Sequence, residues 1–314
     1  MTRHQLLGPG PEFDRVRGIL AALGETAAPS GDDCALLPIG GKMLAVSTDA
    51  SVEGIHFRTD WLTLEEIGHR STAAALSDLA AEGATPLGVV VALGVPRHVS
   101  DADVAAVMKG AGEAARAVET QVVGGDLSAS EGWVVTVTVF GETVRPVTRG
   151  GGRPGDLLYV TGELGGAEVA LRTWLRGALP PAAARERFVH PVPRIVAGRT
   201  LGVHATAMMD LSDGVASDLR HLAAASLCGA ELEVDRLPLA PDVSEFAERT
   251  GRIPAMVGAE GGEDYELLVA LPADLEPPIL DVKLTRVGRL VAGNEVRFLL
   301  DGAPVTPKGF QHFR

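Results

Sequence analysis

The sequence is poor in cysteine and in basic residues. Its 2 cysteines, Cys34 and Cys228, lie far apart, which gives neither a disulfide framework nor the spacing of a zinc site, so a reduced cytoplasm is the expected compartment. Lys and Arg number 28 against 41 Asp and Glu, and the net charge is −13. This excess of acidic groups argues against sequence-independent binding of nucleic acid or of an anionic membrane, because both need surplus cations.

The sequence also lacks long apolar runs and the phosphate-binding P-loop motif. The most apolar run, residues 86–96, is too short to cross a bilayer and is typical of a buried strand. The N-terminal segment lacks the apolar core of a signal peptide. No GxxxxGK[ST] motif occurs, which disfavours a P-loop kinase. If the protein handles phosphates, it must therefore use backbone amides, a few arginines or metal ions.

The composition is rich in aliphatic residues and glycine. Hydrophobic residues make up 46% of the chain, aromatic residues only 4%, and Gly occurs 38 times, which favours an α/β protein with tight turns. A chain of 314 residues is long enough for two domains. The passage over residues 145–156 is rich in Gly, Pro and Arg, as domain junctions often are. We therefore predict an N-terminal domain over residues 1–145 and a C-terminal domain over residues 146–314.

Hydrophobic periodicity predicts strands and helices in both halves. In the first half we expect strands over residues 42–46, 88–93 and 133–140, a short strand ending at 124–126, and helices over 63–82 and 101–118. In the second half we expect strands over 157–161, 205–210, 231–234 and 265–270, helices from 165, over 194–201 and over 211–226, and a hairpin around 291–296. Both halves are thus predicted to be α/β or α+β.

Acidic residues recur at predicted turns and at the ends of predicted strands and helices. They are Asp32 with Asp33, Asp49, Asp78, Asp126, and Asp210 with Asp213. Oxygen donors without His or Cys companions favour Mg²⁺ or Ca²⁺ over zinc. Taken alone, each of these residues is more typical of a turn or a helix N-cap than of a functional site. Asp210 points more strongly to a site, since it directly follows a buried strand, where an unpaired charge is costly.

Neighbouring residues suit either phosphate chemistry or a structural role. Ser47 and Thr48 can complete a magnesium shell or cap a turn. The sequence Gly124-Gly125-Asp126 can turn backbone amides toward a phosphate, although the motif alone is weak evidence. Arg149 suits a phosphate clamp or a solvated linker.

Three further residues suit contacts with an organic substrate. His56 can hydrogen-bond a substrate or close a turn. Glu263, with its neighbour Asp264, precedes a predicted strand and can accept from substrate amines or form a turn. Phe310 can stack on an aromatic ligand or anchor the C-terminal tail.

Seven segments, taken in order, resemble the thiamine-monophosphate kinases. They are GDDCALL, VSTDASVEGIHF, LSDLAAEGATP, VVGGD, TRGGGRPGDLLYVTG, MDLSDGVASDL and GGEDYEL, and together they cover nearly the whole chain. That family belongs with aminoimidazole-ribonucleotide synthetase, selenophosphate synthetase and the hydrogenase-maturation dehydratase. The resemblance implies their two-domain fold, with a C-terminal α/β domain and with N-terminal domains that pair their sheets across a homodimer near bound ATP.

The resemblance also implies an activity and a set of site residues. The activity is transfer of a phosphoryl group from ATP to thiamine monophosphate, in line and without a phosphoenzyme, with several Mg²⁺ ions bound. The implied catalytic residues are Asp49, Asp78, Asp126 and Asp210, and the implied metal ligands are Asp33, Ser47, Thr48, Asp49, Asp78, Asp126, Asp210 and Asp213. The implied ATP contacts are Gly125, Asp126, Arg149 and Ser212, and the implied thiamine-phosphate contacts are His56, Glu263 and Phe310. Met108 stands where the family often has an adenine-stacking aromatic residue.

Two other functions compete with this one. Aminoimidazole-ribonucleotide synthetase is the nearest rival, but the segments EGIHF and GGEDYEL tell against it. A silent nucleotide-binding or metal-binding protein on the same scaffold is the second alternative. The intact acidic positions argue against that alternative.

Overall fold

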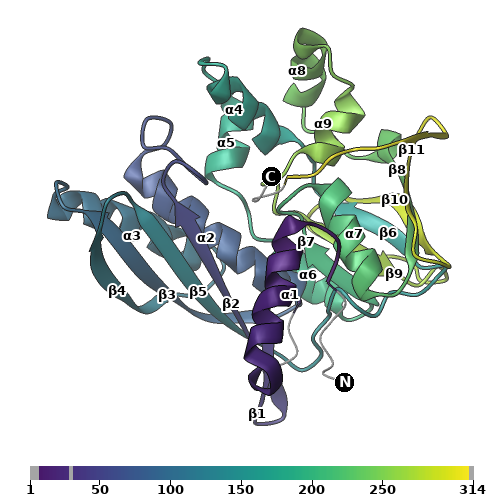
Figure 1. The fold of residues 1–314 in the computed structure, drawn as a ribbon, viewed down its shortest axis with the longest axis horizontal. Helices are drawn as coiled ribbons and strands as arrows, with labels where there is room; N and C mark the ends of the chain where they lie inside the picture. Colours follow the sequence, from purple (N-terminus) through teal and green to yellow (C-terminus); the bar gives the residue numbers. More distant parts are fainter. Residues whose placement is uncertain (1–6, 28–30, 311–314) are drawn as a thin grey trace.

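The computed structural model describes residues 7–27 and 31–310, which form two β-sheets with helices packed on and between them (Figure 1). The first sheet has the order β1-β2-β5-β3-β4, and only the β3 and β4 pair is parallel. Its strands are β1 (Ala35–Ile39), β2 (Lys42–Val52), β3 (Thr85–Pro96), β4 (Val122–Ser130) and β5 (Val134–Thr143). The predicted mixture of strands and helices is confirmed.

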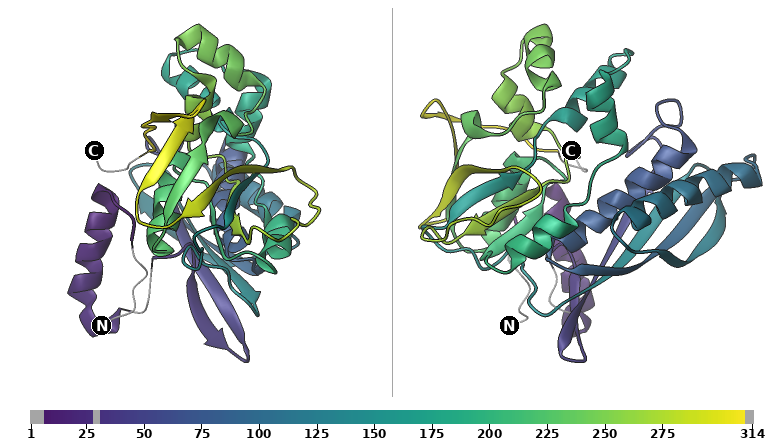
Figure 2. Two further views of the ribbon diagram at one scale, coloured as in Figure 1. Left: turned by 90° about the vertical axis from the view of Figure 1, so that its right-hand side faces the viewer. Right: turned by 180° about the vertical axis from the view of Figure 1, so that it is seen from behind.

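One face of the first sheet is covered by helices α2 (Leu64–Ala81) and α3 (Asp101–Ala117), as Figure 2 shows from behind. Because side chains alternate along a strand, Val135, Val137 and Val139 of β5 are fully buried under this layer. Thr136 and Thr138 point to the opposite face and are only partly buried. We call that second face, carried by β2 to β5, the open face of the sheet.

Helix α2 begins where the sequence predicts it. The Thr63 side chain accepts from the Glu66 amide and the Glu66 carboxylate accepts from the Thr63 amide, which is a complete capping box. Small residues then let α2 and α3 approach closely. A Cβ at Gly68 or at Gly110 would lie 1.8 Å from a carbonyl oxygen of the other helix. The packing fixes α2, and with it Asp78, against the sheet.

The second sheet has the order β12-β11-β8-β10-β6-β9-β7. Its strands are β6 (Leu157–Thr161), β7 (Ala207–Asp210), β8 (Gly229–Glu233), β9 (Leu267–Leu271), β10 (Leu284–Val291), β11 (Val296–Leu300) and β12 (Ala303–Val305). The remaining helices of the described residues are α1 (Pro11–Leu23), α4 (Gly166–Leu175), α5 (Ala182–Val189), α6 (Ile195–Gly202), α7 (Val215–Ala225), α8 (Asp242–Thr250) and α9 (Pro254–Glu260), with short 3₁₀ turns at Gly24–Thr26 and Val234–Arg236. None of the helices in this part of the chain is long and apolar enough to cross a membrane.

The two halves meet along α2. Gly198 of α6 packs on α2 so tightly that a Cβ would lie 2.1 Å from the carbonyl oxygen of Ala80. The first sheet ends at Thr143 and the second begins at Leu157. The domain boundary at residue 145 lies in this connection and stays a prediction.

Three predictions about strands are wrong. Strand β2 continues through Ser47 to Asp49 and ends only at Val52, and β4 runs through residues 124–126 instead of ending there. Polar residues are tolerated in both strands, because β4 is an edge strand of the sheet and because Ser47 and Asp49 on β2 line a cavity. The hairpin around residues 291–296 does not form, since β8 lies between β10 and β11. The connection crosses the start of β8 at Gly229, where a Cβ would lie 2.6 Å from the Glu295 carbonyl oxygen.

Candidate active site

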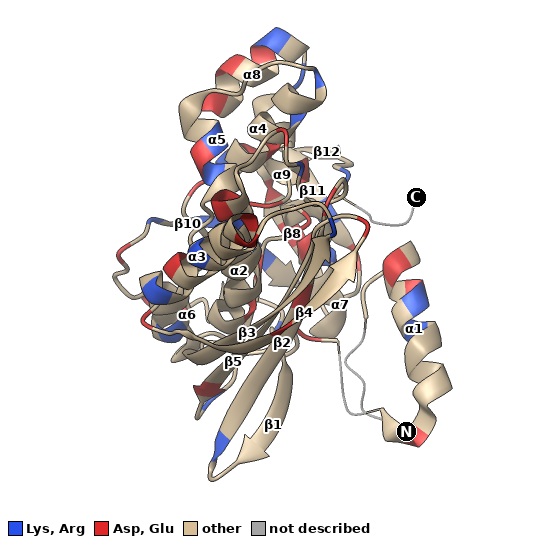
Figure 3. Ribbon diagram, turned by 90° about the vertical axis from the view of Figure 1, so that its left-hand side faces the viewer, with Lys and Arg blue, Asp and Glu red and all other residues tan. Residues whose placement is uncertain are grey.

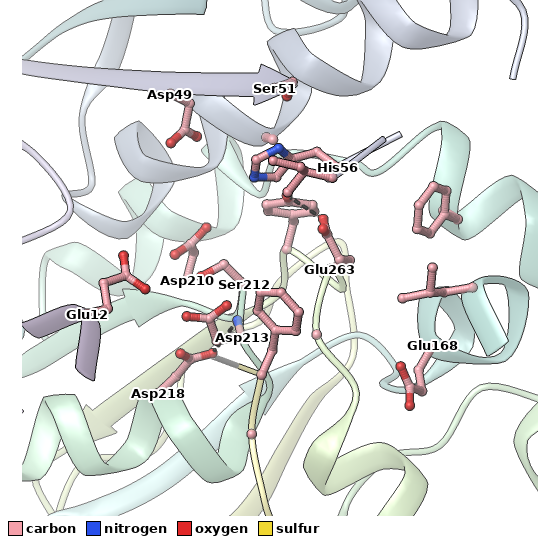
Figure 4. A pocket seen from close by; sticks show the side chains of 18 of the residues that line it. Glu12, Asp49, Ser51, His56, Glu168, Asp210, Ser212, Asp213, Asp218 and Glu263 are labelled. Carbon is pink, nitrogen blue, oxygen red and sulfur yellow. Dashed lines mark hydrogen bonds between the residues drawn. The ribbon is translucent and has the colours of Figure 1, made fainter. Parts of the chain in front are cut away.

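A cavity of about 830 Å³ is lined by residues from both halves of the chain. Strand β2 and helix α2 supply the wall from the first half, and the segments after β7 and α9 supply much of the wall from the second. The predicted site residues that line it are Asp33, Ser47, Asp49, His56, Asp78, Arg149, Asp210, Ser212, Asp213, Glu263 and Phe310. Figure 4 shows Asp49, Asp210 and Asp213 toward one side, with His56 and Glu263 beside them. The structure therefore brings together residues that are up to 277 positions apart in sequence, from Asp33 to Phe310.

Strand alternation aims the residues of β2 into the cavity. Ser47 and Asp49 share the face that α2 covers, because their partners on β5 are the buried Val139 and Val137. Ser47 Oγ donates a hydrogen bond to Asp78 Oδ2 of α2 at 2.5 Å. Strand β2 and helix α2 thus place polar side chains side by side in the cavity wall.

Three carboxylates form the centre of this acidic group. Asp33, Asp78 and Asp210 each place a carboxylate oxygen within 4.8 Å of the others. Removal from water, reinforced by Asp33, raises the pKa of Asp210 to about 8. Burial, with Glu263 and Asp33, raises the pKa of Asp49 to about 6, and burial with Asp49 raises the pKa of Asp78 well above its usual value.

This group fits a hard divalent cation. All of its donors are oxygens, and Asp33 Oδ2 is buried without a hydrogen-bond partner. The crowding of like charges that raises these pKa values is relieved when a cation binds between them. Asp33, Asp49, Asp78 and Asp210, with the Ser47 hydroxyl, are the residues that can hold such an ion.

Arg149 supplies the positive charge nearest to this group. Its Nε and Nη2 donate to Asp33 Oδ1, the first at 3.2 Å, and its backbone amide donates to Asp32 Oδ1 at 3.0 Å. The side chain is 16% exposed and lines the cavity. It is placed to meet an anion that enters there.

The part of the cavity around His56 and Glu263 suits an organic substrate. The Val52 amide donates to His56 Nδ1 at 3.1 Å, so the neutral ring carries its proton on Nε2. Glu263 Oε2 accepts from Arg70 Nη2 at 2.5 Å and from the Tyr265 hydroxyl at 2.6 Å. Glu263 and Tyr265 have positive φ values of 71° and 51°, which is costly backbone for such residues and is often found at binding sites.

Arg70, which donates to Glu263, is a residue near the cavity that the motifs did not reveal. It is 4% exposed, its guanidinium carbon lies 3.8 Å from the centroid of the Phe188 ring, and it also donates to the Phe188 carbonyl oxygen. Its pairing with Glu263 joins α2 to the second half of the chain. Helical spacing could have indicated Arg70 in the sequence. Residues 70, 74 and 78 lie on one face of α2, so Arg70 lies on the same face as Asp78.

Asp218 is another residue of the cavity wall that the sequence motifs did not indicate. It lies on α7, is 2% exposed, and accepts from the Asp213 amide at 3.2 Å. Asp213 in turn accepts from the Phe310 amide through its carbonyl oxygen at 3.0 Å, which fixes the C-terminal segment at the cavity. The nearby helix α1 adds Glu12 and Phe13, and Phe13 packs on the His221 ring at 4.1 Å between centroids.

Thr48, Gly125 and Asp126 do not line the cavity of the single chain. The register runs from Asp49 through Val137 and Val91 to Gly125, so β2 and β4 are three strand spacings apart, roughly 14 Å. Thr48 and Asp126 also belong to the open face, where Thr48 Oγ1 lies 3.0 Å from Thr138 Oγ1. The roles assigned to these three residues stay predictions.

The cation-free protein is expected to lose stability as the pH rises from about 4 to about 8. Asp49 and Asp210 have folded-state pKa values of about 6 and about 8, above the 3.8 of an ordinary Asp. The folded chain therefore holds more protons than the unfolded chain in this window, and its free energy of unfolding falls by up to ~1.4 kcal/mol per unit of pKa shift. Thermal melts in EDTA at pH 5, 6, 7 and 8 measure the effect.

Two comparisons control for other titrating groups. Saturating Mg²⁺ should reduce the fall, because the bound cation favours the ionised carboxylates at every pH. Asp210→Asn in EDTA should also flatten the slope. An unchanged slope in both cases would show that these carboxylates do not share a buried site.

Two family models and several characterised proteins match this chain. Residues 31–143 match the family described as AIR synthase related protein, N-terminal domain, and residues 153–300 match its C-terminal domain. A thiamine-monophosphate kinase of Aquifex aeolicus is 34% identical, with 90% of this chain and 92% of the relative covered. A thiamine-monophosphate kinase of Escherichia coli K12 is 36% identical, with 96% of this chain and 95% of the relative covered.

A solved structure agrees as well. The chain described as AaThiL complexed with AMPPCP and TMP superposes with a TM-score of 0.89 at 33% identity, covering 96% of this chain and 97% of that one. The predicted two-domain fold is confirmed by the two family matches and by this superposition. With relatives above 30% identity over nearly its whole length, this chain belongs to the thiamine-monophosphate kinase family.

Proposed function

We propose that this protein transfers the γ-phosphoryl group of ATP directly to the phosphate of thiamine monophosphate, giving thiamine diphosphate and ADP. The observation that carries the proposal is the single cavity that joins the acidic group of Asp33, Asp78 and Asp210 to His56 and Glu263. Family membership supports the same reaction, and the AaThiL complex contains an ATP analogue together with TMP.

The acidic end of the cavity is the phosphate end in this proposal. Asp33, Ser47, Asp49, Asp78, Asp210 and Asp213 would hold Mg²⁺ there, and the ion would supply the positive charge that offsets the repulsion between two anions. Arg149 and Ser212 line the same part of the cavity and are assigned to the ATP phosphates. The acceptor phosphate is already ionised near neutral pH, so the chain needs no general base.

The other end holds the thiamine part of the acceptor. His56 presents an Nε2–H donor, which suits a phosphate or another anionic acceptor atom. Glu263 is held by Arg70 and Tyr265, and its carboxylate suits the amine of an aminopyrimidine ring. Phe310 is 45% exposed at the cavity and offers a ring to the aromatic part of the substrate.

The proposal includes a homodimer in which the first sheet of one subunit pairs with the first sheet of the other. Within the described residues, the open face has partly buried or exposed side chains, whereas Val135, Val137 and Val139 on the helix face of β5 are fully buried. Charged residues are sparse on strands β2 to β5 and denser on the helices (Figure 3), which suits burial against a second sheet. Thr48 and Asp126 lie on this face and reach a phosphate site only if a partner subunit completes it. The buried free thiols of Cys34 and Cys228 fit a reduced cytoplasm.

Purified protein with ATP, Mg²⁺ and thiamine monophosphate is expected to form thiamine diphosphate and ADP in equal amounts. Chromatography of both products measures the reaction. Thiamine without its phosphate serves as the control acceptor and should give no product, because the reaction requires an ionised phosphate. Failure with thiamine monophosphate, combined with ATP-dependent turnover of a different acceptor, would overturn the proposal.

A further inference from the structure

A second group of carboxylates lies beside the first, and two of its three members have no assigned role. Asp32, Asp33 and Glu82 each place a carboxylate oxygen within 4.8 Å of the others, and we call them the Glu82 cluster. Glu82 is the C-cap residue of α2, while Asp32 and Asp33 precede β1. Asp33 is shared with the catalytic acidic group, but Glu82 and Asp32 are not.

Glu82 is buried without a hydrogen-bond partner. Its exposed fraction is 0%, and neither Oε1 nor Oε2 makes a hydrogen bond. The Cys34 amide is close enough to favour the ionised form slightly, but it does not satisfy the carboxylate. A buried carboxylate in this condition is costly unless a cation or several donors meet it.

The charge of Arg149 favours ionised Glu82, but Arg149 makes no hydrogen bond to it. The guanidinium of Arg149 donates to Asp33 Oδ1 and its backbone amide to Asp32 Oδ1, so its hydrogen bonds go to the other two members of the cluster. Asp33 Oδ2 is likewise buried without a partner. The C-terminal end of α2 adds its own negative partial charge at Glu82. The hydrogen bonds of Arg149 thus leave the Glu82 carboxylate unsatisfied.

We propose that the Glu82 cluster is a further binding site for a divalent cation, separate from the cations of the phosphoryl transfer. The ligands are carboxylate oxygens alone, which favours Mg²⁺ or Mn²⁺ over zinc. Asp32 and Asp33 line the cavity, which gives the cation an entry path. The bound cation ties the segment before β1 to the end of α2 and so holds Asp33 where the first acidic group needs it.

Manganese binding without any nucleotide tests this proposal independently of the kinase reaction. Mn²⁺ titrations followed by electron paramagnetic resonance should give one more bound ion per chain for the wild type than for Glu82→Gln or Glu82→Leu. Glu65→Gln removes one exposed carboxylate from the first turn of the same helix and should keep the wild-type count. Equal counts in the wild type and both Glu82 variants would overturn the proposal, and would instead indicate that Glu82 is buried in its protonated form.

Crystals of the wild-type protein soaked in Mn²⁺ give a second test that needs no variant. An anomalous difference peak within coordination distance of Glu82 is the expected result. Peaks confined to the side of Asp33 that faces Asp78 and Asp210 would refute the site. Melting temperatures supply a third readout, since Mg²⁺ should raise that of the wild type more than that of Glu82→Leu, which has no carboxylate to neutralise.

Discussion

Asp49→Asn is expected to lower the turnover number for thiamine diphosphate formation by about 10²- to 10³-fold, a loss typical of removing a principal electrostatic contact in a transition state. Asp49 points from β2 toward α2 and its charge interacts with those of Asp33 and Glu263. The amide keeps the size of the side chain but cannot supply the negative charge that a bound cation requires. The ADP released per enzyme under saturating ATP and thiamine monophosphate measures the loss.

The same variant should not damage the fold. Removing one member of a crowded group of carboxylates relieves repulsion, so Asp49→Asn in EDTA at pH 8 should melt no lower than the wild type. Asp274→Asn is the matched control, because Asp274 is exposed and remote from the cavity residues. That variant should keep full activity. Wild-type turnover by Asp49→Asn would show that the metal assignment at this strand is wrong.

The sequence predicted α2 and α3 well because their ends carry local signals, whereas α1 was not predicted. The capping box of Thr63 and Glu66 and the small residues along α2 are complete within a few residues of sequence. Strand pairing depends on partners far along the chain. The insertion of β8 between β10 and β11 follows from a close approach at Gly229, which no local pattern encodes. Neither the extra length of β2 nor that of β4 was predicted, because polar residues in a strand resemble a turn.

The site was predictable where short motifs carry it. Asp33, Asp49, Asp78 and Asp210 each stand in a motif of the family, and the structure places all four at one cavity. Residues whose roles come from burial could not be found in this way. Arg70 and Glu82 belong to the same helix as Asp78, but only the packing shows that Arg70 is fixed by Glu263 and that Glu82 lacks a partner.

Asp126 gives the sharpest test of the proposed dimer, because its carboxylate lies on the open face and does not line the cavity of its own chain. If the phosphate site takes Asp49 from one subunit and Asp126 from the other, two inactive variants can complement each other. Asp49→Asn and Asp126→Asn should each be inactive as homodimers. A heterodimer of the two contains one site with both aspartates intact.

The number of intact sites sets the activity expected of each dimer. The purified heterodimer should show about half of the wild-type activity, and an equal mixture that reassociates at random should show about a quarter, because about half of its dimers are mixed. A heterodimer of Asp49→Asn with Asp78→Asn is the matched control. Both of those residues line the cavity of the same chain, so neither site is complete and no activity should return. Two affinity tags allow each heterodimer to be isolated and assayed for ADP release. If the heterodimer of Asp49→Asn and Asp126→Asn is as inactive as this control, Asp126 does not act across the subunit interface, and the polar side chains of the open face need another explanation.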